Sequence, residues 1–181
     1  YFSIDTYNSE TAQAALEIGA SMINDISAGT VDSVMFETVA AFKAPYVLMH
    51  MQGTPLNMQE KPQYSDITKE VKSFLIRQTQ AATAAGINDV IIDPGFGFGK
   101  TVTHNYSLLK ELDSLTDLNC PILLGISRKS MIYKRLNSSP DQALNGTTAL
   151  HAWGLDRGAS ILRVHDVKEA KECVDLWTAL H

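Results

Sequence analysis

Short apolar segments recur along the chain and alternate with helical patterns, and this alternation limits the possible folds more than any other feature. Six such segments occur, at residues 2–4, 22–26, 46–49, 90–92, 122–126 and 161–164. They are nearly continuous in Val, Ile, Leu and Met, as expected for strands that are covered on both faces. Strands that alternate with helices indicate a parallel α/β sheet.

Helical patterns fill the stretches between these strands. We expect helices over residues 10–18, 31–43, 103–115, 140–157 and 167–180, and a long helix from residue 65 or 66 to Gly86. Ser9 and Thr103 are the expected N-caps of two of them, because their hydroxyl oxygens can accept a bond from a backbone N–H of the first turn.

Each expected strand ends in polar side chains, which distinguishes between two parallel folds. These side chains belong to Asp5, Asn24 and Asp25, His50, Asp93, Ser127, and Arg163 and His165. In an open doubly wound sheet only a few strand ends contact the ligand. In a closed (β/α)8 barrel, the TIM barrel, all strand ends meet at one mouth. The pattern therefore favours an α/β TIM barrel. Since such a barrel has about 250 residues, the 181 residues and six units predict one domain, residues 1–181, without the first two βα units.

Composition excludes several classes of protein. The chain has 15 Lys and Arg against 20 Asp and Glu, a net charge of −5, so it lacks the cation excess of a nucleic-acid binder. No apolar run approaches the length of a membrane span. The two cysteines, Cys120 and Cys173, match neither a disulfide framework nor a zinc site, which indicates a reducing cytoplasm.

The densest motif is DPGFGFGKT at residues 93–101. It fails as a Walker A loop and as a dinucleotide fingerprint, because its glycines have the wrong spacing for either. Two interpretations stay open: a tight turn with glycines at positive φ, or a binding loop whose backbone passes close to a flat ligand. Three alternating glycines with two exposed aromatic residues, Phe96 and Phe98, favour the second.

Cations gather at the last two strand ends. Arg128 and Lys129 stand at a helix start, where the helix dipole disfavours cations, so both are expected to serve a ligand with an anionic or carbonyl group. Arg163 and His165 alternate and therefore point to one side, which favours an anion clamp over a structural role. For His50 two interpretations stay open: it packs within the protein, or it supports residues that contact the ligand.

Together these groups fit one kind of ligand. A heterocycle with an amidine-like edge is recognised by a carboxylate such as Asp93 or Asp5, which accepts two parallel N–H bonds. The ring carbonyl of that heterocycle suits the cation of Lys129, and its other ring nitrogens suit the amide of Asn24. Such a heterocycle is a pterin, and the clamp beside it would hold a phosphate or a diphosphate.

The sequence resembles the dihydropteroate synthase family of the folate pathway, the target of sulfonamides, from Ser3 to about Glu169. The matching motifs are SIDT at 3–6, INDI at 23–26, LMHMQG at 48–53, the loop 93–101, GISRKS at 125–130 and RVHD at 163–166. The resemblance implies a cytoplasmic, usually homodimeric (β/α)8 barrel. With Mg²⁺, it condenses 6-hydroxymethyl-7,8-dihydropterin diphosphate and p-aminobenzoate to 7,8-dihydropteroate and pyrophosphate.

The resemblance also implies roles for residues around the pterin. Asp93 corresponds to the carboxylate that anchors the ring, with Asn24 and Asp5 as further ring contacts. Lys129 corresponds to the cation at the pterin carbonyl and N5, and Met49 would pack on the ring.

The second substrate and the leaving group have implied contacts as well. Arg163 and His165 correspond to the residues that hold the diphosphate. Ser127 corresponds to the contact for the carboxylate of p-aminobenzoate, in a cleft formed by Phe98 and Lys129. The catalytic residues implied are Asp5, Lys129, Arg163 and His165.

Two family loops, of NxTPDSFS and GESTRP type, do not occur in this sequence. The first supplies a Mg²⁺ ligand, so no metal ligand is expected in this chain, and the 181 residues alone are expected to be inactive. One alternative is a pterin-binding methyltransferase that passes a methyl group to a corrinoid, which would not need the diphosphate clamp. The other is a non-catalytic pterin-binding fragment.

Overall fold

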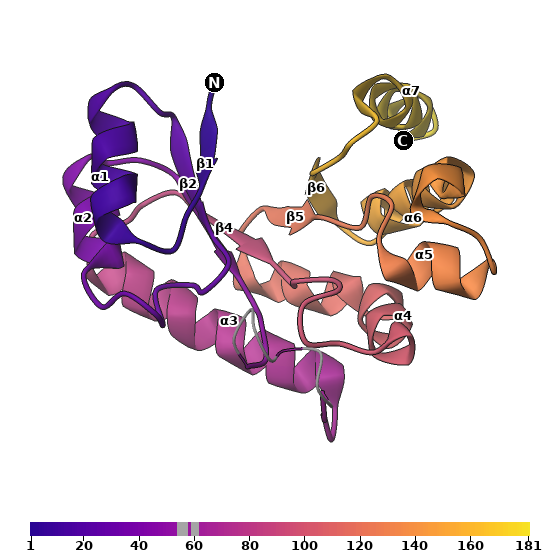
Figure 1. Cartoon of the computed structure of the whole chain (residues 1–181), viewed down its shortest axis with the longest axis horizontal. Coiled ribbons are helices and arrows are strands. Elements are labelled where there is room, and N and C mark those ends of the chain that lie inside the picture. Colours follow the sequence, from indigo (N-terminus) through magenta and orange to yellow (C-terminus); the bar gives the residue numbers. More distant parts are fainter. Residues whose placement is uncertain (54–57, 59–61) are drawn as a thin grey trace. The chain divides into compact units, whose positions relative to one another are not determined.

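A computed structural model describes residues 1–53, 58 and 62–181. The chain divides into two compact units, which we call the N-terminal unit (residues 1–51 and 69–95) and the C-terminal unit (residues 52–68 and 96–181). Both units consist of strands that alternate with helices (Figure 1). The parallel α/β class predicted from the sequence is confirmed.

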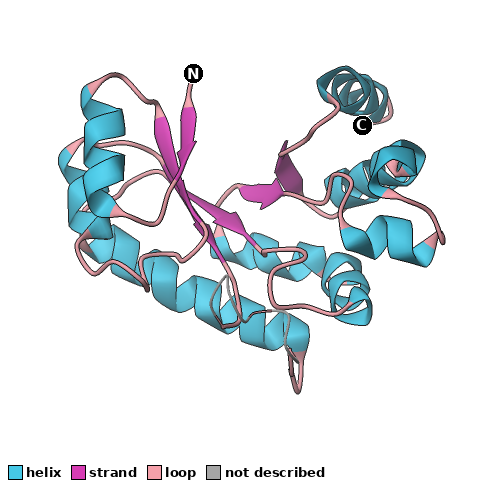
Figure 2. Ribbon diagram, viewed as in Figure 1, coloured by secondary structure: helices cyan, strands magenta, loops and turns pink. Residues whose placement is uncertain are grey.

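The N-terminal unit contains four parallel strands that pair in chain order. Its elements are β1 (Ser3–Asp5), α1 (Ser9–Glu17), β2 (Met22–Asp25), α2 (Met35–Ala41), β3 (Tyr46–Met49), most of α3 (Ile67–Ala84) and β4 (Val90–Asp93). Helices α1, α2 and α3 lie to one side of these strands (Figure 2). The strand order β1-β2-β3-β4 follows the chain and does not reverse, whereas an open doubly wound sheet has its switch point where the strand order reverses.

The C-terminal unit contains a parallel strand pair with its helices. Its elements are α4 (Val102–Lys110), the 3-10 helix η1 (Leu112–Leu118), β5 (Ile122–Leu124), α5 (Ser130–Arg135), the 3-10 helix η2 (Pro140–Gln142), α6 (Leu144–Asp156), β6 (Ala159–Leu162) and α7 (Val167–Thr178). Strand β5 pairs with β6 in parallel, with a register shift between Ile122 and Leu123.

Continuous apolar runs became strands because both of their faces are buried. Every residue of β3 and β4 is buried, so neither strand needs the alternation of a half-exposed strand. Among the described residues, no helix is both long and apolar enough to cross a lipid bilayer.

The hydrogen bonds at the starts of α1 and α4 show that other residues than the predicted ones cap these helices. Asn8, and not Ser9, caps α1, since its Oδ1 accepts from Thr11 N–H at 2.8 Å. Thr101, and not Thr103, caps α4: its Oγ1 accepts from the N–H of His104 at 3.1 Å, and the His104 ring Nδ1 accepts from the N–H of Thr101 at 3.3 Å. The imidazole takes the role that Glu or Gln has in the usual capping box.

Other boundaries differ because periodicity does not separate α-helix from a short 3-10 turn. The predicted helices 103–115 and 140–157 each combine an α-helix with a 3-10 segment. The helix start predicted at Arg128 and Lys129 is that of the short helix α5, for which no range was predicted. The last strand begins at Ala159, two residues before the predicted start, because the positive φ of Gly158 ends the preceding helix and extended backbone follows at once. It ends at Leu162, two residues before the predicted end.

Candidate functional site

Four of the predicted pterin contacts lie on one face of the N-terminal sheet. Asp5 is in register with Asn24, Asn24 with Val47, and Met49 with Asp93. Residues that are in register, or two positions apart along a strand, share a face because side chains alternate. Val47 and Met49 are two apart, so Asp5, Asn24, Met49 and Asp93 present their side chains together at the carboxyl ends of the strands.

Asp25 occupies the opposite face and has a structural task. It is fully buried, and its two carboxylate oxygens accept bonds from Ser27 N–H and Oγ–H, both 2.7 Å, from Gly29 N–H at 2.8 Å and from Tyr46 O–H at 2.5 Å. The Tyr46 ring packs edge-on against Phe36 of α2, at 5.5 Å between centroids. Burial, reinforced by the neighbouring carboxylate, raises the pKa of Tyr46. Asp25 therefore holds the loop after β2.

Asn24 and Asp5 form a polar pair with an unused acceptor. Asn24 Nδ2 donates to Asp5 Oδ1 at 2.7 Å, and Asn24 is only 7 % exposed. Its Oδ1 is buried and accepts no hydrogen bond from the part of the chain that the structure describes. A buried acceptor without a donor costs about 1–3 kcal/mol, and an N–H donor of a bound molecule would remove that cost.

Asp93 is buried at the end of β4, and the backbone fixes its orientation. Its Oδ1 accepts from Gly95 N–H at 2.7 Å, and its backbone carbonyl accepts from His50 N–H at 3.0 Å. The His50 ring packs edge-on against Phe74 of α3, at 5.0 Å between centroids. That contact favours the packing role for His50, and Met49 beside it is 2 % exposed.

The glycines of the loop after β4 are explained by contacts within the protein. Gly95, Gly97 and Gly99 have φ of 71°, 83° and 60°. A Cβ on Gly95 would lie 1.9 Å from the backbone oxygen of His50, and one on Gly99 would lie 2.6 Å from that of Gln52. The glycines therefore allow a tight turn against the segment after β3. This observation supports the tight-turn interpretation, and the interpretation as a binding loop stays a prediction.

The two aromatic residues of this loop have different surroundings. Phe96 is fully buried, which corrects the expectation that both rings are exposed, whereas Phe98 is only half-buried. The Lys129 ammonium lies 4.8 Å from the centroid of the Phe98 ring and donates to the Phe96 carbonyl at 2.5 Å. Lys129 therefore contacts both aromatic residues of the loop. The aminobenzoate cleft that the family resemblance assigns to Phe98 and Lys129 stays a prediction.

Ser127 and His165 are hydrogen-bonded to each other. Ser127 is 3 % exposed, and its Oγ accepts from His165 N–H at 3.2 Å and lies 3.0 Å from the ring Nδ1. Arg163 and His165 are both exposed after β6, with half-buried Val164 between them, so they do point to one side. The structure couples two residues that the resemblance assigned to different substrates.

Arg128 is engaged by the protein itself, which corrects the prediction that it serves a ligand. Its Nε and Nη2 each donate to Asp166 at 2.8 Å, and its Nη1 donates to the carbonyls of Pro140 and Asp141, both at 2.9 Å. These bonds raise the pKa of Arg128 and lower that of Asp166. The other cation of the pair, Lys129, contacts the loop after β4 instead.

The sequence analysis missed three side chains that bond the glycine-rich loop: Tyr64, Lys100 and Asn105. None of them follows a strand, so the strand-end pattern does not reveal them. Lys100 lies within the loop and Asn105 in the first turn of the next helix, which is the signal they offer in the sequence. Tyr64 lies 35 positions before Gly99 and offers none.

The described residues do not by themselves form a metal centre. Within residues 1–53, 58 and 62–181, no group of three or more His, Cys, Asp or Glu side chains could hold an ion. We derive no chemical step through the Mg²⁺ that the resemblance implies.

Parallel βα units with buried polar side chains at the carboxyl ends of their strands define an α/β protein of the ligand-binding kind. Residues 1–165 match the family described as pterin binding enzyme. The chain therefore belongs to the pterin binding enzyme family.

Named relatives agree with this assignment. The chain is 43 % identical to dihydropteroate synthase of Escherichia coli K12 over 96 % of this chain and 62 % of that protein. It matches the crystal structure of Thermus thermophilus dihydropteroate synthase in complex with 4-aminobenzoate with a TM-score of 0.95 and 39 % identity, over 99 % of this chain and 70 % of the other. It matches the Xanthomonas albilineans enzyme in complex with 7,8-dihydropteroate with a TM-score of 0.91 and 39 % identity, over 98 % and 68 %. The chain thus spans somewhat less than two thirds of the E. coli relative.

Proposed function

We propose that this chain carries the substrate-binding part of a dihydropteroate synthase, a transferase. The reaction joins 6-hydroxymethyl-7,8-dihydropterin diphosphate and p-aminobenzoate into 7,8-dihydropteroate and releases pyrophosphate. The observation that carries the proposal is the set Asp5, Asn24, Met49 and Asp93 on one sheet face, with a buried acceptor on Asn24. The Thermus relative bound to 4-aminobenzoate supports the identity of the second substrate.

The N-terminal unit would bind the pterin. The amidine-like edge of a pterin has two parallel N–H donors, which one carboxylate can accept together, and Asp93 is buried in a fixed orientation. Asn24 Oδ1 would accept a ring N–H, with Asp5 holding the amide of Asn24. Met49 supplies an apolar, polarisable surface for the ring.

The C-terminal unit would handle the aminobenzoate and the leaving group. Lys129 would lie at the pterin carbonyl and N5 and, with Phe98, would form the aminobenzoate cleft, in which Ser127 contacts the carboxylate. Arg163 and His165 would hold the diphosphate.

In the reaction, the bond from the pterin methylene carbon to the diphosphate oxygen breaks, and its electron pair leaves with pyrophosphate. The aniline nitrogen then attacks that carbon and loses a proton. The cations stabilise the departing charge, and the cleft positions the nitrogen.

The test is a turnover assay of the full-length gene product with both substrates. We expect dihydropteroate to form in proportion to the p-aminobenzoate consumed. Methyl transfer from methyltetrahydrofolate to a corrinoid would instead establish the methyltransferase alternative, and pterin binding without either turnover would establish a non-catalytic pterin-binding protein.

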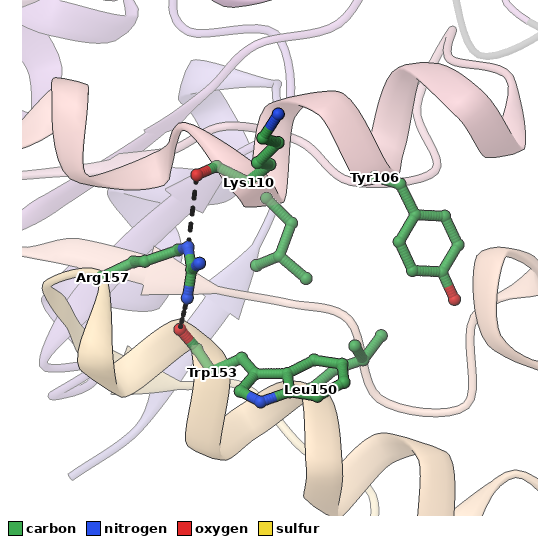
Figure 3. A pocket seen from close by; sticks show the side chains of 6 residues that line it. Tyr106, Lys110, Leu150, Trp153 and Arg157 are labelled. Carbon is green, nitrogen blue, oxygen red and sulfur yellow. Dashed lines mark hydrogen bonds between the residues drawn. The ribbon is translucent and has the colours of Figure 1, made fainter.

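We also propose a homodimer in the cytoplasm that uses Mg²⁺. For the dimer, α4 and α6 offer an apolar surface. Leu150 and Trp153 of α6 and Tyr106 of α4 line a cavity of about 290 Å³. Figure 3 shows these side chains, and Trp153 is 56 % exposed. A Trp153→Glu variant should reduce the mass measured by light scattering from that of a dimer to that of a monomer.

The proposed use of Mg²⁺ is tested by chelation. Loss of turnover with EDTA, restored by added Mg²⁺, would support a requirement for this metal ion.

We propose further that two more βα units complete a TIM barrel. An apolar cavity of about 620 Å³ lies beside β6 and α7 within the C-terminal unit, lined in part by Leu162, Val167 and Trp177. Additional secondary structure would cover such a surface, and the greater length of the E. coli relative supports this.

A further inference from the structure

We propose that Asn105 is a positioning residue, which sets the conformation of the glycine-rich loop and, through that loop, the place of Lys129. The inference rests on the proposed function for its catalytic consequence, while its structural consequence is separate. Asn105 belongs to α4 and is not among the residues that the family resemblance assigned to a substrate.

The Asn105 side chain joins the loop to the start of the next helix. It is 1 % exposed. Its Oδ1 accepts from Gly97 N–H at 2.8 Å, and its Nδ2 donates to the carbonyl of Thr101 at 2.7 Å. An amide is needed for this pair of bonds, because one end must accept while the other donates. Leucine has nearly the same volume and can do neither.

The bond to Gly97 belongs to a continuous set along the loop. Each of four consecutive loop residues has a backbone group that bonds to a side chain of the C-terminal unit: Phe96 to Lys129, Gly97 to Asn105, Phe98 to Lys100, and Gly99 to Tyr64. We call these four side chains the loop clamp. Because each of the residues 96–99 has a backbone group bonded to a side chain, the loop clamp restricts the conformation of the whole loop.

Lys129 is the member of the loop clamp that the proposed chemistry uses, and it touches the loop at three consecutive residues. Its ammonium donates to the Phe96 carbonyl and lies over the Phe98 ring. Its Cδ lies 3.3 Å from the position that a Cβ on Gly97 would occupy. A shift of Gly97 would therefore displace both the carbonyl and the ring that hold the ammonium.

The consequence should be selective for one substrate. Phe98 and Lys129 form the proposed aminobenzoate cleft, so p-aminobenzoate would lose both contacts. The pterin would lose only its contact with Lys129 and would keep its anchor Asp93, which is fixed by Gly95 and by neither end of Asn105. Loss of the Asn105 bonds should thus weaken recognition of p-aminobenzoate more than recognition of the pterin diphosphate.

The experiment compares Asn105→Leu with Tyr106→Phe in the full-length gene product. Tyr106 is the next residue of α4, and its hydroxyl donates to the carbonyl of Met131 at 3.2 Å, away from the loop. We expect Asn105→Leu to raise KM for p-aminobenzoate about tenfold while KM for the pterin diphosphate stays within about twofold. Tyr106→Phe should change neither. Equal changes in both KM values, or a lower Tm with both KM values unchanged, would overturn the proposal.

A second measurement does not depend on turnover. Acetylation of lysine side chains by a limiting active ester, followed by peptide mass spectrometry, reports how firmly each ammonium is held. In Asn105→Leu we expect Lys129 to react several-fold faster, with exposed Lys134 of α5 unchanged. An unchanged Lys129 rate would refute the positioning role. A faster Lys129 rate in a protein without dihydropteroate turnover would keep the positioning role and reject the proposed function.

Discussion

Adjacent polar residues at the strand ends of this chain have opposite tasks. Asn24 shares the face of Asp5, while Asp25 points to the other face, where Tyr46 and backbone N–H groups surround it. The reason is the two-residue period of a strand, which separates neighbours in sequence onto different faces. A polar residue next to a site residue is therefore as likely to support the loop as to meet a ligand.

At Asp93, the charge and the geometry can be separated by one substitution. Asp93→Asn keeps an oxygen for the N–H of Gly95, so the turn should survive. It places an amide donor against one of the two pterin N–H groups. We expect the Kd for a pterin to rise roughly 10- to 100-fold, because an unsatisfied buried pair costs about 1–3 kcal/mol and more with a charged partner. Calorimetric titration measures it, and an unchanged Kd would remove Asp93 from the site.

At Arg163, the question is whether the guanidinium recognises the diphosphate. Arg163→Ala should raise the Kd for the pterin diphosphate by about tenfold or more, and that for the bare hydroxymethyl pterin by less than about twofold. Arg157→Ala is the matched control, since Arg157 precedes β6 and donates to the carbonyls of Lys110 and Trp153. Equal losses for both ligands would mean that Arg163 is structural.

Among the elements, the loop after β4 depends on the segment after β3. Gly95 approaches the His50 carbonyl so closely that any side chain would overlap the backbone. The N–H of His50 in turn donates to the carbonyl of Asp93. These contacts make the carboxylate position a property of two βα units rather than of one loop.

This dependence predicts a large cost for Gly95→Ala. The new Cβ would lie 1.9 Å from the His50 oxygen at a φ of 71°, so we expect a loss of about 3 kcal/mol or more in the free energy of unfolding. Gly19→Ala is the control, because Gly19 has φ of 100° with no atom within 4 Å, and it should cost only the conformational strain of about 1–2 kcal/mol. Urea denaturation of both variants gives the comparison. Equal losses would show that backbone conformation, and not the contact with β3, makes glycine necessary at residue 95.

At the scale of the whole molecule, exposed apolar surfaces beside β1 and β6 are expected to control association with other chains. Phe2 beside β1 is 72 % exposed, and the cavity beside β6 and α7 is largely apolar. Strand edges with apolar neighbours pair readily with other chains.

These surfaces predict how the 181 residues behave when they are made alone. We expect them to associate in light scattering and to show negligible turnover with Mg²⁺ and both substrates. A chain with about 70–90 more N-terminal residues, the difference from a typical barrel, should be monodisperse and active. A monomeric and active 181-residue chain would contradict the proposal that two further βα units complete the barrel.

Local patterns predicted much of the fold. The apolar runs located all six strands, and their continuity indicated burial on both faces, because a strand covered by helices has no solvent side. The strand-end rule predicted that Asp5, Asn24 and Asp93 lie at the same end of the strands, whereas the register decided that they share a face and that Asp25 does not. Helix ends were predicted less well, since caps such as Asn8 and Thr101 depend on which of several nearby hydroxyl or amide groups meets the first turn.

The sequence by itself determined the parallel α/β class and the residues that end each strand, because both follow from periodicities of a few residues. Only the tertiary structure decided which of those residues face a ligand. Arg128 is bonded to Asp166, 38 positions later, and Asn105 reaches back to Gly97. Whether a polar side chain is satisfied within the protein depends on partners brought together by folding, and no short-range pattern contains that information.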